Sequence, residues 1–146
     1  MASAAAGFLP LLPEGHAIPN FDPRRYEEVI RTSGVRMLLA EEAGELLGYT
    51  AFGRSRDLDV APDVGEVRAF FVAPAAWRRG VGSALMAEAL ASLSESGYTE
   101  ATVWSFDANA RANAFYEHHG FRRNGAEKRQ ELWAGVLEVR YRRPLP

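Results

Sequence analysis

The sequence predicts a mixed α/β fold in which antiparallel hairpins accompany helices, rather than an all-parallel, doubly wound sheet. Runs rich in β-branched and aromatic residues alternate with segments whose apolar residues recur at helical spacing. The predicted order is a helix, three strands, a helix, a strand, a helix and further strands, and consecutive strands favour hairpins. At 146 residues the chain has the usual length of one domain, so we expect a single domain with a loose leader at residues 1–20.

The composition excludes several classes of protein. Seventeen basic and nineteen acidic residues give a net charge of −2, which argues against a nucleic-acid partner. The sequence has no cysteine, and its three histidines lack helical i, i+4 spacing, so we expect no disulfide, no thiol nucleophile and no metal site. No stretch approaches the ~20 apolar residues that cross a bilayer. Because no Lys or Arg precedes Arg24, residues 2–12 do not form a secretion signal, and we expect a cytoplasmic protein without a membrane partner.

The first half of the chain predicts one helix and three strands. Asp22-Pro23 opens the helix, because Asp caps helices and Pro suits their first turn, and Gly34 ends it. The strands are expected at residues 35–40, 46–52 and 66–72, with a turn at 42–44 and a polar loop at 53–65.

The second half predicts two helices among three strands. One helix begins at Gly82 and ends at Gly97. Asp107 or Asn109 caps the other, which Gly120 ends. The strands are expected at residues 99–106 and, around Gly125 and Gly135, within residues 121–143.

The segment Arg78-Arg79-Gly80-Val81-Gly82-Ser83 joins a predicted strand to a predicted helix. Glycines let the backbone approach a ligand closely, and a helix start presents free amides that suit phosphate groups. A plain tight turn with solvated arginines explains the segment equally well when it is taken alone. It is neither a Walker loop nor a full dinucleotide fingerprint, because the required Gly-Lys-Ser/Thr and third glycine are missing.

A second segment, at residues 109–121, carries Asn109, Ala112, Phe115-Tyr116 and Gly120-Phe121. With both segments, the chain resembles the GNAT superfamily of N-acetyltransferases, which transfer an acetyl group from acetyl-CoA to an amine. In that family a strand ending in an apolar pair leads into Q/R-x-x-G-x-G/A, and N-x-x-A, an aromatic-Tyr pair and Gly-Phe follow. The resemblance covers about residues 35–141 and implies a GNAT-like central, mixed, mostly antiparallel sheet flanked by helices.

The resemblance implies that acetyl-CoA is the cosubstrate. The amides of residues 79–83 would receive its pyrophosphate, and the edge of the strand ending at Phe71-Val72 would pair with its amide-rich arm. Asn109 would bind the arm or the phosphates from the other side. The expected cofactor-binding residues are Phe71, Val72, Arg78, Arg79, Gly80, Val81, Gly82, Ser83, Asn109 and Ala112.

Acetyl transfer needs two proton movements, because only a neutral amine attacks and the departing thiolate must be protonated. Tyr116 stands where the family has its general acid, and the alternative is a core aromatic. Glu66 precedes Gly80 by fourteen residues, as the glutamate base does in the family's histone-acetylating members. We therefore expect Glu66 to be the base, directly or through water. The alternative is an ion pair with Arg68 or another arginine.

Three features differ from the family pattern or leave a role open. Trp77 occupies the Q/R position, three residues before Gly80. The strand and long helix that usually open the family should be missing or much shortened, through truncation, a late start or replacement by a partner chain. Trp104 and Phe106 either line the substrate pocket or belong to the core.

Charged residues near the expected acceptor site support only weak expectations. The acidic residues of the loop at 53–65 could attract a cationic amine, but a solvated loop is the simpler interpretation. A solvated strand face likewise explains the basic cluster of Arg140, Arg142 and Arg143.

The sequence therefore predicts an N-acetyltransferase that moves an acetyl group from acetyl-CoA to a primary amine of a small molecule or peptide, by direct attack in a ternary complex. The alternative, motivated by Trp77 and the short N-terminus, is a catalytically inactive CoA-binding sensor or assembly module. A third candidate, a binder of other nucleotides, lacks an acidic ribose-binding residue. By analogy with open-edged sheets that pair with a second copy, a homodimer is also expected.

Overall fold

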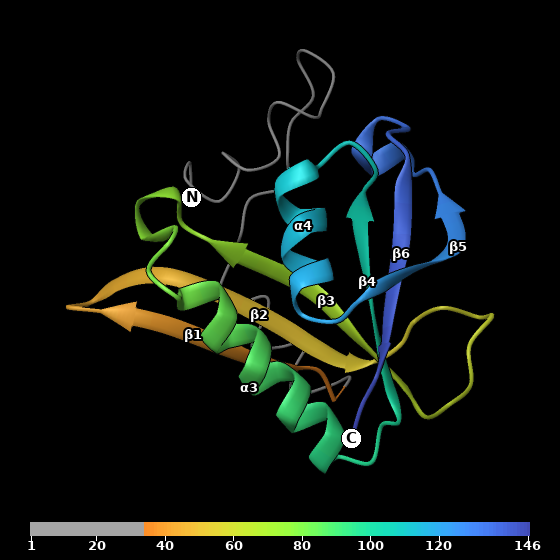
Figure 1. The fold of residues 1–146 in the computed structure, drawn as a ribbon, viewed down its shortest axis with the longest axis horizontal. Helices are drawn as coiled ribbons and strands as arrows, with labels where there is room; N and C mark the ends of the chain where they lie inside the picture. Colours follow the sequence, from red (N-terminus) through yellow and green to blue (C-terminus); the bar gives the residue numbers. More distant parts are fainter. Residues whose placement is uncertain (1–33) are drawn as a thin grey trace.

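The computed structural model describes residues 34–146, which form one six-stranded sheet with two α-helices on one face (Figure 1). The strand order is β1-β2-β3-β4-β6-β5, and every neighbouring pair is antiparallel except β3 with β4. The predicted mixed, mostly antiparallel sheet is confirmed. The leader at 1–20, the helix expected from Asp22 and the question of a shortened opening unit lie outside the described residues.

The elements follow the predicted order. The strands are β1 Arg36–Glu42, β2 Glu45–Arg54, β3 Val64–Val72, β4 Glu100–Phe106, β5 Arg122–Lys128 and β6 Glu138–Pro144, the α-helices are α3 Val81–Glu95 and α4 Ala110–His118, and two 3₁₀ turns are η2 Pro74–Ala76 and η3 Glu131–Trp133. In this part of the chain, neither helix is long and apolar enough to cross a membrane.

The hairpin of β1 and β2 turns through two residues, Ala43 and Gly44. Their φ angles are 51° and 82°, the positive values that a tight two-residue hairpin turn requires. β2 extends to Arg54 and β3 begins at Val64, so the predicted polar loop shortens to residues 55–63.

The centre of the sheet is paired over a short length. β3 and β4 pair in parallel only between Val64–Val67 and residues 100–103. Beyond these pairs β3 continues to Val72 and β4 to Phe106 without pairing with each other. The register of β2 and β3 shifts at the same level, leaving Arg68 as an extra residue in β3. Such a bulge bends its strand. The sheet therefore opens between β3 and β4, beyond Val67.

Both helices bury their apolar faces on one side of the sheet. Met86 and Leu93 of α3 and Tyr116 of α4 share a core cluster with Val67 and Val103 of the two central strands. Burial of this shared apolar surface is the main force that holds the helices against the sheet. The helical spacing seen in the sequence is thus confirmed for α3 and α4.

Candidate active site

The helix α3 begins in a turn that leaves amides free. Its N-cap Gly80 has a φ of 80°, and Arg78 before it also has a positive φ, of 65°. The amide of Ala84 donates to the carbonyl oxygen of Gly80, so the amides of the three intervening residues have no acceptor within the helix. No side chain of residues 34–146 caps this end. The turn can therefore receive an anion, aided by the helix dipole.

Gly82 lets α4 and the end of β3 come close to this turn. A Cβ atom at Gly82 would lie 3.2 Å from the Phe115 ring and 3.4 Å from a methyl carbon of Val72. Ser83 and His119 connect the two helices, since Ser83 Oγ lies 3.3 Å from His119 Nε2. Burial, followed by the charges of His118 and Arg143, lowers the pKa of His119. A neutral imidazole therefore stands beside the start of α3 near neutral pH.

The start of α4 is fixed by two asparagines. Asn109 Oδ1 accepts a hydrogen bond from the Ala112 amide at 3.2 Å, which confirms it as the cap. Asn113 is buried and bonds to Ser105 Oγ and to the carbonyl oxygens of Phe106 and Asp107. The sequence analysis missed Asn113, although its polar side chain lies on a helix face between apolar positions. It anchors α4 to the far end of β4.

Tyr116 lies inside the core cluster under α4, with 7% of its surface exposed. Its ring packs near those of Phe115, Phe121 and Tyr141. Burial raises the pKa of Tyr116, so the phenol keeps its proton across the neutral range. Tyr116 thus packs among core aromatic side chains, and its hydroxyl carries the proton that a general acid needs.

Glu66 is almost fully buried, at 2% exposure, and both of its oxygens are bound by Arg56. Arg56 Nη2 donates to Oε2 at 2.8 Å, while Nε and the backbone amide of Arg56 donate to Oε1 at 3.3 and 3.0 Å. Arg68, two residues after Glu66 in β3, instead donates to the carbonyl oxygen of Arg54 at 2.6 Å. The structure thus brings Glu66 to an arginine of the 55–63 loop.

Trp77 lies between the end of β3 and the start of α4. Its indole Nε1 donates to the carbonyl oxygen of Val72 at 2.9 Å. The guanidinium carbon of Arg111, from the first turn of α4, lies 3.7 Å from the centre of the Trp77 ring. Arg79, in contrast, pairs with Glu42 at the tip of β1. The sequence did not indicate Arg111 as a site residue, because the contact depends on two elements that meet only in the fold.

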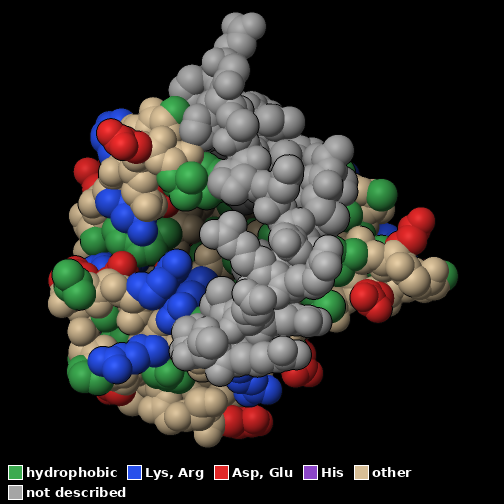
Figure 2. Space-filling model, turned by 180° about the vertical axis from the view of Figure 1, so that it is seen from behind, with side chains coloured by type: hydrophobic (Ala, Val, Ile, Leu, Met, Phe, Trp, Pro, Cys, Tyr) green, Lys and Arg blue, Asp and Glu red, His purple; other side chains and the backbone are tan. Residues whose placement is uncertain are grey.

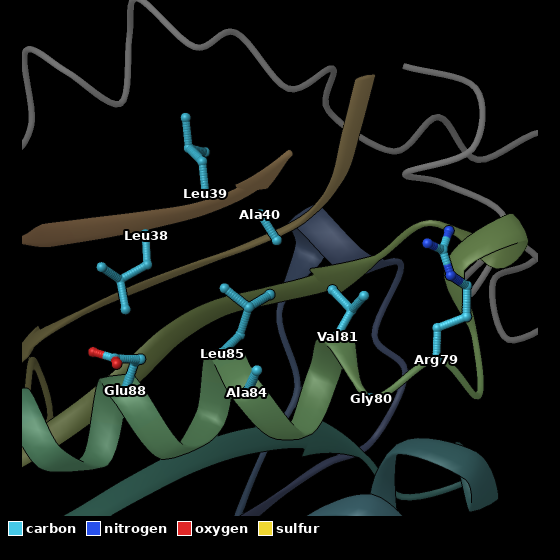
Figure 3. A pocket seen from close by; sticks show the side chains of 9 residues that line it. All are labelled: Leu38, Leu39, Ala40, Arg79, Gly80, Val81, Ala84, Leu85 and Glu88. Atoms are coloured by element: carbon cyan, nitrogen blue, oxygen red, sulfur yellow. The ribbon is translucent and has the colours of Figure 1, made fainter. Parts of the chain in front are cut away.

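The other expected cofactor-binding residues differ in exposure. Phe71 is buried against Tyr49, with ring centres 5.5 Å apart. Val72 is half-buried beside Gly82, and Arg78 is exposed. Val81 lines a pocket of about 380 Å³ between β1 and α3, together with Leu38, Ala40, Leu85 and other residues (Figure 3). This pocket lies on a different side of α3 from Gly82, which faces α4.

The face of the sheet away from the helices carries Trp104. Its neighbours in β4 face the other way, because Val103 is in the helix-side core and Ser105 bonds to Asn113. Trp104 Nε1 donates to both carboxylate oxygens of Asp57, at 3.1 and 3.2 Å. Phe106, two residues further along β4, is buried and meets the ring of Trp133 edge-on, with centres 5.8 Å apart.

Arg140 is buried on this face, so the expectation that its charge is solvated was wrong. Its side chain is 6% exposed and binds Asp57 at 3.0 Å and Asp59 at 2.7 and 2.8 Å. These bonds raise the pKa of Arg140 and lower that of Asp59. The acidic loop at 55–63 is therefore tied to the sheet. Figure 2 shows basic side chains gathered on the β4–β6–β5 side of this face.

Comparison with known proteins agrees with this arrangement. Residues 5–121 match the sequence model of the acetyltransferase (GNAT) family. The chain is 32% identical over 101 residues to a probable N-acetyltransferase of Mycobacterium tuberculosis, covering 68% of this chain and 54% of that protein. It is 28% identical over 106 residues to an uncharacterized N-acetyltransferase of the same organism, covering 73% and 65%. The match thus spans between half and two thirds of these relatives.

Solved structures share the fold. The ribosomal-protein-alanine N-acetyltransferase of Brucella melitensis aligns with a TM-score of 0.76 and 22% identity, over 97% of this chain and 89% of that one. The Salmonella typhimurium protein yncA, solved with its cofactor acetyl-CoA, aligns with a TM-score of 0.74 and 20% identity, over 98% and 84%. At 22% and 20% identity these two structures show only that the fold is shared. The family assignment therefore rests on the sequence match. The chain belongs to the acetyltransferase (GNAT) family.

Proposed function

We propose that the protein is an N-acetyltransferase that moves the acetyl group of acetyl-CoA to a primary amine of a small molecule or peptide, by direct attack in a ternary complex. The observation that carries the proposal is the opening between β3 and β4, which begins after Val67 and Val103 and ends beside the free amides of α3. Membership of the GNAT family supports the same assignment.

The opening suits the extended shape of the cosubstrate. Beyond Val67, as far as Val72, the edge of β3 that faces β4 has no strand partner among the described residues, over about 17 Å at about 3.3 Å per residue. Free strand edges bind extended amides as an added strand. The α3 amides at one end favour a pyrophosphate, and Arg111 on Trp77 adds a fixed positive charge nearby. Acetyl-CoA supplies the activated acetyl thioester.

Glu66 is proposed to accept the proton of the acceptor amine through water. Such an amine, with a pKa of about 10.4, is almost entirely charged near neutral pH and must lose a proton before it attacks. Both Glu66 oxygens already accept hydrogen bonds from Arg56, which favours relay through water over direct contact.

Tyr116 is proposed to protonate the departing thiolate. Its raised pKa means that the hydroxyl carries its proton at the start of each cycle. Because a thiol has a pKa of about 8.5, the phenol is the weaker acid, and it gives up its proton only along a hydrogen bond to the developing thiolate. Solvent then restores the proton of Tyr116.

Acetyl-CoA binding, measured by calorimetry with CoA, ATP and NAD as controls, tests the first half of the proposal. Binding that ATP and NAD do not match is the expected result, and equal binding of all four would overturn the assignment. Release of free thiol with a panel of primary amines then tests catalysis. Binding without any transfer would instead identify the CoA-binding module, an alternative favoured by Trp77 in the Q/R position and by the Arg56–Glu66 ion pair.

A cytoplasmic location and a homodimeric assembly belong to the same proposal. Cell fractionation and light scattering of the purified protein are the measurements that check them.

A further inference from the structure

The sequence contains a single lysine. Of its seventeen basic Lys and Arg residues, only Lys128 carries a primary amine on its side chain. Its Nζ lies 4.1 Å from the centre of the Trp104 ring, within the range of a cation–π contact. Lys128 is the last residue of β5, next to Glu138 of β6, so its side chain reaches across β6 to the ring on β4.

Trp104 marks the point where the central strands part. It follows Val103, the last residue of β4 that pairs with β3. Its side chain lies on the face opposite α4, where neither described helix covers the sheet. If the acetyl end of the cosubstrate reaches the closed end of the opening, an acceptor amine meets it from this face. Lys128 thus holds a primary amine where the proposed reaction needs one.

The ammonium group of Lys128 is held by its contact with the Trp104 ring and by no salt bridge among the described residues. Within residues 34–146, no ion pair joins Lys128 to a carboxylate. The guanidinium carbon of Arg140 lies 5.4 Å from the centre of the same ring, and Arg140 forms ion pairs with both Asp57 and Asp59. The ammonium of Lys128 therefore rests on the ring beside a second cation, and it can leave the ring without breaking a salt bridge.

We propose that Lys128 is an acetylation site of the protein itself, with acetyl-CoA as the donor. This inference rests on the proposed function. The ammonium first gives one proton to solvent or to the proposed base. The nitrogen lone pair then forms a bond to the carbonyl carbon of the acetyl group, and the carbon–sulfur bond breaks. The nitrogen then loses its second proton, and the sulfur keeps the electron pair of the broken bond, takes up a proton directly or through solvent, and leaves as CoA thiol. The product is N-acetyl-lysine, which has no charge.

Acetylation of Lys128 changes the sheet face that carries Trp104, from which the acceptor amine is expected to approach. The neutral amide no longer makes a cation–π contact with Trp104, and the ring becomes available to the ammonium of another amine. Modified and unmodified protein should therefore differ in their KM for cationic acceptors, with the lower KM in the modified form.

The test is to incubate the purified full chain with acetyl-CoA and no added amine, and to follow it by intact mass and peptide mapping. We expect one acetyl group on Lys128, at a rate independent of protein concentration and at least about 100-fold above that of the urea-unfolded chain. Lys128→Arg should gain none at this position. Trp104→Leu should slow the modification several-fold, whereas Trp133→Leu, which removes a neighbouring indole that packs on Phe106, should not.

The outcomes separate this inference from the function on which it rests. Transfer to an added amine without acetylation of Lys128 overturns the inference and keeps the function. Equal rates in the folded and unfolded chains also overturn the inference, because they indicate uncatalysed chemistry. A rate that rises with protein concentration replaces it by transfer between molecules. Failure to acetylate both Lys128 and every amine of the panel overturns the proposed function itself.

Discussion

Arg111 lies face-on over the indole of Trp77, with its guanidinium carbon 3.7 Å from the ring centre. The same indole donates to the carbonyl oxygen of Val72, so its position is fixed at the end of β3. In the family pattern a glutamine or arginine stands at the position of Trp77. Here the tryptophan has no charge of its own, and it instead holds a cation that α4 supplies.

Replacing Arg111 by Gln is expected to weaken acetyl-CoA binding about tenfold, because one charge-assisted contact to a phosphate is lost. The loss should shrink at high salt, which screens such contacts. Calorimetry at two salt concentrations measures both effects. Arg36→Gln, on the distant strand β1, serves as the control for net charge. Unchanged affinity in Arg111→Gln would mean that Arg111 only packs on Trp77.

Tyr116→Phe should lower turnover on the order of 100-fold while acetyl-CoA affinity changes little, because only the hydroxyl is removed. Steady-state kinetics at neutral pH, paired with calorimetry, separates the two quantities. Tyr141→Phe is the matched control, since it removes another buried tyrosine hydroxyl, one that accepts a hydrogen bond from Arg123. Equal losses in both variants would point to packing rather than proton donation.

Glu66→Gln and Arg56→Gln together test the base. Both variants break the same ion pair, but only Arg56→Gln leaves a buried charge without its side-chain partner, because Glu66 is 2% exposed and Arg56 is 57% exposed. Arg56→Gln should therefore reduce the free energy of unfolding more than Glu66→Gln does. Only Glu66→Gln removes the proposed base, so it alone should lower turnover with an added amine, on the order of 100-fold at neutral pH. Steady-state kinetics and denaturant unfolding of both variants measure the two effects. If both variants lose turnover equally, Glu66 has a structural role only.

His119 should make stability depend on pH. Its pKa is lowered in the folded chain, mainly by burial, whereas the unfolded chain takes up the proton near the ordinary value of 6.5. As the pH falls through 6.5, the unfolded state therefore binds more protons and the free energy of unfolding falls. His119→Gln should remove this decline, as seen by urea unfolding at about pH 7.5 and about pH 5.5.

Two comparisons complete the His119 test. His118→Gln should keep a smaller decline, because burial remains after that neighbouring charge is removed. A decline of the same size in His119→Gln and in the parent protein would assign the pH dependence to other groups.

Local signals in the sequence were enough for much of the fold. The start of α3 depends on Gly80 and its positive φ, and the cap of α4 depends on Asn109, so neighbouring residues determine both. The hairpin turn at Ala43 and Gly44 is equally local. Alternation and helical spacing indicated which faces are buried, and the core cluster confirms them for α3 and α4.

Contacts between residues that are far apart in the sequence could not be predicted from local sequence patterns. Arg140 and Asp59 are 81 positions apart, and nothing in the sequence indicates that the loop folds onto β6. The expectation of a solvated Arg140 was therefore wrong. The sequence analysis included an arginine partner for Glu66 as an alternative, but the identity of that partner, Arg56, depends on the path of the 55–63 loop. Trp77 and Arg111 meet only because the start of α4 lies near the end of β3.

The four-residue pairing of β3 with β4 has a consequence for hydrogen exchange. It is the seam between two three-stranded antiparallel units, β1-β2-β3 and β4-β6-β5. Opening this seam breaks few backbone bonds, so its amides should exchange through a local fluctuation rather than through global unfolding. A ligand that lies between the strands bridges the two units. Amide exchange at residues 64–67 and 100–103 therefore reports on occupancy of the opening even when no reaction takes place.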